Sequence, residues 1–405
     1  MRLDVCACGA ASAELLYANG GSILNGGFCS DSNILDRYAW LVDNGVTTVV
    51  ESWACGDSVE IDADGPLQDW YARNYDLTIV RSAGDANSAV ACAFLHNGLC
   101  VGGVKVDRTY DSGLSSWHNP SDFPHHDREE PDLTALSGIG TEVLAMDDAA
   151  LINGTRDYWV GSGSGGTSFA APAVGAAVAL FKDVCNGRAP GSLPEIVVRA
   201  GVMAAAYLAD PAGDGGYSTP EANCVPEDPY CDKHDGAGLL YGAALMDLCG
   251  FNLTGNKSTL GVVPVDPVGG GGRPPSTPPD GKYGGGAVSG LGLGAVQLNA
   301  GEKLRAVISW NTCARYRTHG EGNSVADIDL WLFNRSTNQW ATRSNGSLAR
   351  SASYDDNNEG FEFESAGGGN FEPYVVWNNG QQPCFSQAVE PVGFAIISGP
   401  NIPRP

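Results

Sequence analysis

Over residues 1–250 the chain alternates short apolar runs with longer amphipathic stretches. The apolar runs, which we expect to be strands, lie at 14–18, 46–53, 77–83, 99–106 and 142–146. The amphipathic stretches, which we expect to be helices, lie at 32–43, 66–75, 168–183, 193–207 and 239–248. Runs that are apolar on both faces are typical of strands buried between helices. The pattern therefore predicts an α/β domain over residues 1–250, with a mostly parallel sheet flanked by helices.

The second part of the chain has a different composition. Residues 251–286 are rich in glycine and proline, which favours a linker. Residues 287–400 contain short alternating runs with turn residues between them, for example at 304–310, 328–333 and 374–377. This pattern is typical of an antiparallel β-sandwich. We therefore expect an all-β domain over 287–400.

Net charge and hydropathy exclude two classes of partner. The chain of 405 residues carries 47 acidic and 23 basic side chains, so its formal net charge is −24. Binding to nucleic acid needs clustered Lys and Arg, so we expect no nucleic-acid partner. The longest apolar stretch, at 170–181, is interrupted by Pro172 and Gly175 and falls short of the ~20 residues of a membrane span.

Cysteine usage and glycosylation motifs indicate an oxidising compartment. The twelve cysteines are dispersed and form no CxxC pair, which favours structural disulfides over a zinc site. Five N-x-S/T motifs begin at Asn153, Asn252, Asn256, Asn334 and Asn345. We expect a secreted protein. No apolar run follows Met1, so a signal peptide is not part of this sequence.

One segment has the residues of a nucleophile. Glycines crowd the positions from 161 to 166, and an alanine-rich helix is expected to begin at Ser168. Unpaired amide groups and the positive end of the helix dipole would then lie beside the Ser168 hydroxyl and stabilise negative charge on a substrate oxygen. A plain N-cap before a buried helix is an alternative. A phosphate-binding loop is disfavoured, because Thr167 stands where such loops have lysine.

The segment 166–172, Gly-Thr-Ser-Phe-Ala-Ala-Pro, resembles the nucleophile segment of the subtilisin-like serine peptidases, or subtilases. Supporting segments follow the family's order at 49–53, 78–85, 99–104, 130–135 and 236–240. The resemblance covers about residues 1–250. It implies an endopeptidase that acts on polypeptides, requires no cofactor and uses Ser168 as its nucleophile.

The same resemblance implies the other site residues. The backbone N–H of Ser168 and the side chain of Asp85 would form the oxyanion hole. The substrate cleft would be lined by Ser52, Trp53, Ser82, Ala83 and Gly84. Most subtilases have asparagine where this chain has Asp85, and a carboxylate can donate a hydrogen bond to an oxyanion only when it is protonated.

The family's catalytic aspartate and histidine precede the matched segments, and the sequence does not show them. None of the six histidines, at positions 96, 118, 125, 126, 234 and 319, lies in a His-Gly-Thr context. We therefore expect that the N-terminal part of the domain is missing and that this chain alone is inactive or nearly so. The alternative is a non-catalytic pseudopeptidase, or a secreted binding protein that uses the β-sandwich.

The C-terminal region resembles the jelly-roll sandwich that follows the catalytic domain in some subtilases, on the segments 327–332 and 354–363. Asp327 and Asp329 share one face of the expected strand, where two carboxylates repel each other. A structural calcium ion would relieve that repulsion. A solvated strand face is the alternative interpretation.

Overall fold

The structure is a computed structural model. It describes residues 2–3, 15–16, 31–52, 64–85, 92, 95–105, 131–137, 142–146, 158–162, 165–186, 193–207, 236–265, 275–276, 288–312, 328–351, 357–378 and 390–402. Trp53, Asp327 and the histidines other than His96 lie outside these residues.

A six-stranded sheet forms the centre of the first domain, in the order β3-β4-β5-β6-β10-β9. Its strands are β3 (Thr48–Glu51), β4 (Thr78–Ser82), β5 (Leu99–Val104), β6 (Leu133–Leu136), β10 (Leu239–Leu240) and β9 (Ala206–Tyr207). Neighbours from β3 to β10 run parallel, and β9 pairs antiparallel with β10. The predicted parallel sheet is confirmed.

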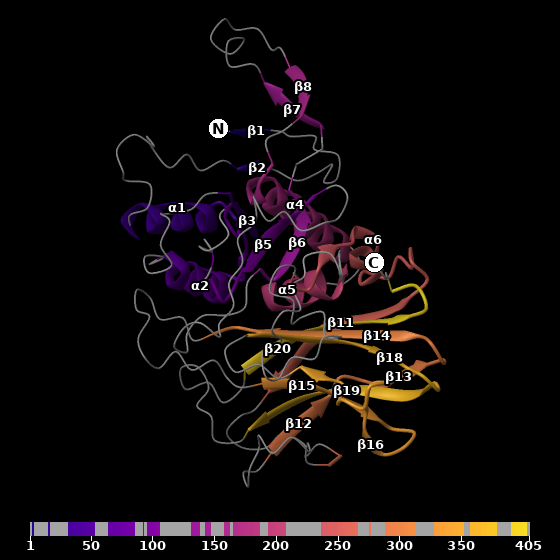
Figure 1. The fold of residues 1–405 in the computed structure, drawn as a ribbon. Coiled ribbons are helices and arrows are strands. Elements are labelled where there is room, and N and C mark those ends of the chain that lie inside the picture. Colours follow the sequence, from indigo (N-terminus) through magenta and orange to yellow (C-terminus); the bar gives the residue numbers. More distant parts are fainter. Residues whose placement is uncertain are drawn as a thin grey trace, which may run out of the picture.

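Helices cover both faces of this sheet (Figure 1). The helices α1 (Asp31–Asp43) and α2 (Asp64–Tyr75) pack on one face. On the other face lie α4 (Thr167–Asn186), α5 (Glu195–Ala204) and α6 (Gly242–Asp247). Successive residues of a strand point to opposite faces, so Ile79 joins the first core and Val80 the second.

Several element boundaries differ from the sequence predictions. The helix expected over 193–207 ends at Ala204 and is followed by β9, and the helix expected over 239–248 begins as β10. The strand β7 (Glu142–Met146) is confirmed, but it pairs with β8 (Tyr158–Ser162) rather than with the main sheet. A further short antiparallel pair joins β1 (Arg2–Leu3) to β2 (Leu15–Leu16). The strand β2 lies inside the run predicted at 14–18.

The second domain is a sandwich of two antiparallel sheets, as predicted. One sheet has the order β11-β20-β14-β18, with β11 (Lys257–Val265), β20 (Glu390–Gly399), β14 (Lys303–Trp310) and β18 (Asn358–Glu364). The other has the order β12-β19-β15-β16, with β12 (Val288–Gly292), β19 (Gly369–Asn378), β15 (Ile328–Asn334) and β16 (Gln339–Trp340), and with β13 (Val296–Leu298) and β17 (Arg350–Ser351) beside β19 and β15. Between the sheets lies an apolar core that includes Trp310, Phe361 and Trp377.

The predicted linker is too long at its start. Residues 257–265, which we assigned to it, form β11, and all nine pair with β20. The strand largely alternates in exposure along its length, a pattern that its glycine and its proline obscure in the sequence. Pro264 is tolerated because β11 is the edge strand of its sheet, where a missing N–H leaves no ladder bond broken.

The two domains share a buried contact through α5. All ten residues of this helix are buried, and the apolar cluster around it includes Val307, Ala395 and Ile397 of the sandwich. A Cβ on Gly393 of β20 would lie 2.5 Å from the backbone carbonyl of Ile196. The sandwich sheet therefore packs directly on the helix backbone, without side chains between them at that point.

Arg199 satisfies polar groups in this contact. Its guanidinium donates to Glu195 within α5, at 2.9 Å, and to the carbonyl of His96, at 3.0 Å. It also donates to the carbonyl of Trp310 at 2.9 Å and to Oδ1 of Asn311 at 3.0 Å, both in the sandwich. A buried guanidinium needs such partners, since an unpaired buried charge is strongly destabilising.

Two disulfides confirm the prediction of structural bridges. Cys185 at the end of α4 is joined to Cys249 after α6, and Cys92 is joined to Cys100 on β5. Both bridges lie within the first domain.

Glu390 lies in the contact between the two domains and makes the stability of the protein depend on pH. Its carboxylate lies 3.6 Å from the guanidinium of Arg73 on α2. Burial raises the pKa of Glu390 to about 7, although Arg73 acts to lower it. Between pH 4.5 and 7 the folded protein thus keeps a proton that the unfolded chain has released. The free energy of unfolding is expected to fall by about 3 kcal/mol as the pH rises through this window.

Urea unfolding of the wild type and of Glu390→Gln between pH 4 and 8 checks this expectation. The amide does not titrate, so the variant should lack this part of the decline, and the two curves should diverge as the pH rises. Parallel curves over the whole range would show that Glu390 does not titrate in this window.

Candidate active site

Ser168 lies in the first turn of α4, on the side of the sheet where the parallel strands end. The helix begins at Thr167, and the Ser168 side chain is exposed. The next turns pack on the strands, with Ala170, Ala171 and Val174 fully buried. Small residues at these positions let the helix lie close to the sheet, and a Cβ on Gly175 would meet Val50 of β3 at 2.2 Å. The serine is therefore carried by a rigid core helix.

Ser52, directly after β3, contacts the nucleophile candidate. Pro172 has no N–H, so the carbonyl of Ser168 lacks the hydrogen bond that residue 172 would normally donate within the helix. The Ser52 hydroxyl donates to this carbonyl instead, at 3.1 Å. In return the Ser168 hydroxyl donates to the carbonyl of Ser52, at 3.5 Å. The end of β3 is thereby held against the first turn of α4.

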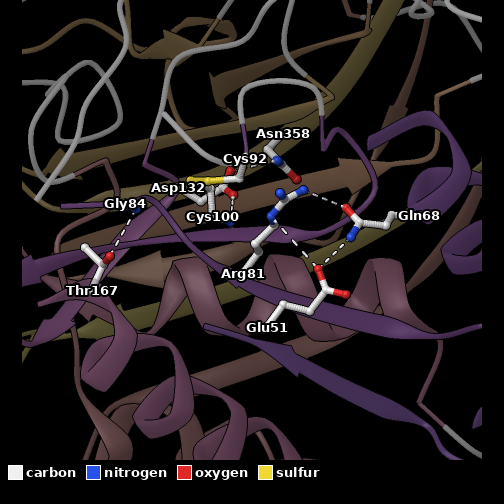
Figure 2. Close-up of a disulfide and its surroundings, with 9 residues drawn as sticks. All are labelled: Glu51, Gln68, Arg81, Gly84, Cys92, Cys100, Asp132, Thr167 and Asn358. Atoms are coloured by element: carbon white, nitrogen blue, oxygen red, sulfur yellow. Dashed lines mark hydrogen bonds and ion pairs between the residues drawn. A yellow bond between two sulfur atoms is a disulfide. The ribbon is translucent and has the colours of Figure 1, made fainter. Parts of the chain in front are cut away.

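Asp85, after β4, binds the start of the same helix. Its Oδ1 accepts hydrogen bonds from the backbone N–H of Thr167 at 2.8 Å and from the Thr167 hydroxyl at 3.0 Å. The Thr167 hydroxyl in turn accepts from the N–H of Gly84, at 3.0 Å (Figure 2). A carboxyl group placed this way satisfies an amide at the helix N-terminus and lies favourably in the helix dipole.

The other predicted cleft residues are placed differently from one another. Ser52 is exposed and Gly84 is half-buried, whereas Ser82 and Ala83 are buried, at 3% and 0% exposure. Ala83 also still donates its N–H to the carbonyl of Val101 on β5. The chain thus leaves the sheet at Gly84, and the structure brings together Ser52, Gly84, Asp85 and Ser168.

No general base accompanies Ser168 within the described residues. His96 is the one histidine among them, and its backbone carbonyl accepts from Arg199 and from Asn357 of the sandwich. Its loop therefore belongs to the contact between the domains. The hydrogen bond of the Ser168 hydroxyl goes to a carbonyl, which cannot take up a proton at neutral pH.

Of the two predicted calcium ligands, Asp329 alone is described. Its side chain is fully buried on β15, so the interpretation as a solvated strand face is wrong for this residue. No group of three or more His, Cys, Asp or Glu side chains that could hold a metal occurs among the described residues. The calcium site remains a prediction.

A buried polar cluster beneath the site was not predicted. It consists of Tyr38 on α1, Glu51 on β3, Gln68 on α2 and Arg81 on β4, all at most 4% exposed. The sequence does contain a signal: two otherwise apolar strands carry a charged residue at or next to their last position, in Thr-Val-Val-Glu and Thr-Ile-Val-Arg-Ser. Their partners on α1 and α2 could not be identified from spacing.

Among the described residues, α4 is the one helix long and apolar enough to cross a membrane. Its buried residues pack on the strands of the central sheet, as expected of the core helix of a folded domain.

A sequence profile of the subtilase family matches residues 4–238, more than half of the chain. This match and the geometry around Ser168 define the class of protein: the chain belongs to the subtilase family of serine peptidases. No match was found among curated proteins.

Three solved protease structures are similar to part of this chain. The prenylagaramide maturation protease PagA is 18% identical, with 54% of this chain and 67% of that chain covered and a TM-score of 0.38. The patellamide maturation protease PatA is 19% identical, with 55% and 69% covered and a TM-score of 0.39. The serine protease of Aeromonas sobria is 12% identical, with 91% and 75% covered and a TM-score of 0.32.

Gly166 allows Asp85 to reach the helix. Its φ is +151°, and a Cβ there would lie 2.8 Å from Oδ2 and 3.0 Å from Oδ1 of Asp85. Gly45 also has a positive φ, of +72°, but nothing lies within 4 Å of its Cβ position. We expect Gly45→Ala to cost about 1 kcal/mol of unfolding free energy from backbone conformation alone. Gly166→Ala should cost a further ~1–3 kcal/mol from the clash.

Urea unfolding of both variants measures this difference. Equal losses in Gly166→Ala and Gly45→Ala would mean that Asp85 does not occupy the position described.

Proposed function

We propose that the chain is a serine endopeptidase that hydrolyses peptide bonds through an acyl-enzyme on Ser168. The observation that carries this proposal is an exposed serine in the first turn of a buried helix, in a chain of the subtilase family. The N–H of Thr167 bonds Asp85 and that of Phe169 bonds the carbonyl of Gly166. Within the described residues no hydrogen bond occupies the N–H of Ser168.

In this mechanism the Ser168 hydroxyl attacks the scissile carbonyl, and its own N–H stabilises the oxyanion. Asp85 assists in its protonated form. Its Oδ1 already accepts two hydrogen bonds from Thr167, so Oδ2 would be the donor atom of a protonated Asp85. An ionised Asp85 would instead repel the developing charge.

The proton of Ser168 needs an acceptor, and the described residues provide none. We propose that the described residues do not include the triad aspartate and histidine. We also propose that this chain by itself hydrolyses peptides about 10⁴–10⁶-fold more slowly than a subtilase with a complete triad. Ser52, Trp53 and the turn at Gly84 would bind the substrate backbone. The disulfides support a secreted location.

A binding role for the sandwich has less support. Its aromatic cluster of Trp331, Phe333 and Trp340 is at most 9% exposed, and Arg350 lies over the Trp331 ring, 4.9 Å from its centroid. The rings therefore form part of the packing.

Peptide hydrolysis by the purified chain tests the proposal, with Ser168→Ala as the matched control. We expect turnover at that lowered rate, and an acyl-enzyme that mass spectrometry detects on Ser168 of the wild type and not in the variant. The residual rate itself should change little in Ser168→Ala, because the loss of one triad member costs about as much as the loss of all three. An acyl group on a residue other than Ser168 would contradict the nucleophile assignment. Turnover at the rate of a complete triad that the variant abolishes would show that a base lies in the remaining residues.

The role of Asp85 has a separate test. In Asp85→Asn the amide oxygen can still accept from Thr167, while the amide nitrogen can donate to an oxyanion at any pH. We expect the variant to react with a fluorophosphonate at Ser168 at least about 10-fold faster than the wild type at pH 8. Equal rates would assign Asp85 to the helix N-terminus alone.

A further inference from the structure

The charged ends of β3 and β4 lie side by side below the candidate active site. In the parallel register Glu51 of β3 is opposite Arg81 of β4. The residue after Glu51 is Ser52, which exchanges hydrogen bonds with Ser168. Four residues after Arg81 comes Asp85, which binds Thr167. Whatever fixes Glu51 relative to Arg81 therefore fixes the two strand ends that hold the first turn of α4.

Hydrogen bonds with side chains from two helices hold this pair. Glu51 accepts from the hydroxyl of Tyr38 at 2.9 Å and from the amide of Gln68 at 2.5 Å. Arg81 donates to the other side of the same amide, to Oε1 of Gln68, at 3.0 Å. Nε of Arg81 lies 4.0 Å from Oε2 of Glu51. Figure 2 shows Gln68 bridging the two charged groups.

This arrangement defines position more than it adds stability. A buried ion pair costs desolvation that its attraction barely offsets, and apolar residues of similar volume are often equally stable in its place. Its hydrogen bonds, however, are directional, so they favour particular orientations of the side chains that make them. Burial and the charge of Glu51 both raise the pKa of Tyr38, so its hydroxyl remains a donor to the carboxylate at neutral pH.

We infer that Tyr38, Glu51, Gln68 and Arg81 form a positioning network that sets the spacing of the β3 and β4 ends, and through Ser52 and Asp85 the orientation of Ser168. The inference rests on the proposed function, because that orientation has a consequence only if Ser168 reacts. None of the four side chains is placed at the substrate; they act through the residues that contact the nucleophile helix.

Glu51→Gln tests the network, because it removes the charge and one acceptor with little change of volume. The matched control is Glu362→Gln in the sandwich, where a largely buried carboxylate bonds Lys303 and Arg305 on the neighbouring strand. The first readout is amide hydrogen exchange at Gly84 and Thr167, whose N–H groups bond across the site. The second is the rate at which a fluorophosphonate labels Ser168.

In Glu51→Gln we expect exchange at Gly84 and Thr167 to accelerate at least about 10-fold while exchange within β5 is unchanged, and labelling to slow by about 10-fold. Glu362→Gln should change neither readout more than about 2-fold, even where it lowers the midpoint of urea unfolding equally. Tyr38→Phe, which removes a single hydrogen bond, should give a smaller effect in the same direction and serves if Glu51→Gln does not fold.

Unchanged exchange at both amides in Glu51→Gln, or equal changes in Glu362→Gln, would overturn the inference. Faster exchange in Glu51→Gln with unchanged labelling would also overturn it, because the spacing of the strands would then not control Ser168. Because the chain is expected to react about 10⁴–10⁶-fold more slowly than a complete triad, labelling is followed at high probe concentration over days, with Ser168→Ala as the blank. A wild type that is labelled no more than Ser168→Ala under these conditions would count against the proposed peptidase. The exchange readout would still decide whether the network holds the strand ends.

Discussion

The structure of the candidate site depends on how the first turn of α4 is held between two strand ends. A helix N-terminus exposes amide groups without partners, and here a carboxylate, a backbone N–H and a carbonyl from the ends of β3 and β4 bond to that turn. Because Pro172 has no N–H, the carbonyl of Ser168 has no hydrogen-bond donor within the helix. The Ser52 hydroxyl donates to this carbonyl instead. Ser168 is therefore exposed, yet the backbone that carries it is fixed from both sides.

The same contacts explain why an aspartate is compatible with this position. As a helix cap, Asp85 is favourable in its ionised form, because the helix dipole and the Thr167 N–H stabilise the charge. As an oxyanion donor it must be protonated.

Much of the fold could be predicted because burial leaves a periodic pattern. Apolar runs such as Thr78–Ser82 marked the parallel sheet, and the small residues after Ser168 marked a closely packed helix. β11 was assigned to a linker, since Pro264 and Gly261 resemble turn residues when the partner strand is unknown. Within the candidate site, local motifs were enough to identify Ser168 and the residues that follow β3 and β4. The network of Tyr38, Glu51, Gln68 and Arg81 could not, because its members meet only through tertiary packing.

The most direct measurement is a crystal structure of the chain with a peptide boronate, whose boron forms a tetrahedral adduct with a reactive serine. Our account predicts a bond from boron to Oγ of Ser168, with one boronate oxygen accepting a hydrogen bond from the N–H of Ser168. An empty site at saturating boronate, or an adduct whose oxygens point away from the start of α4, would contradict it.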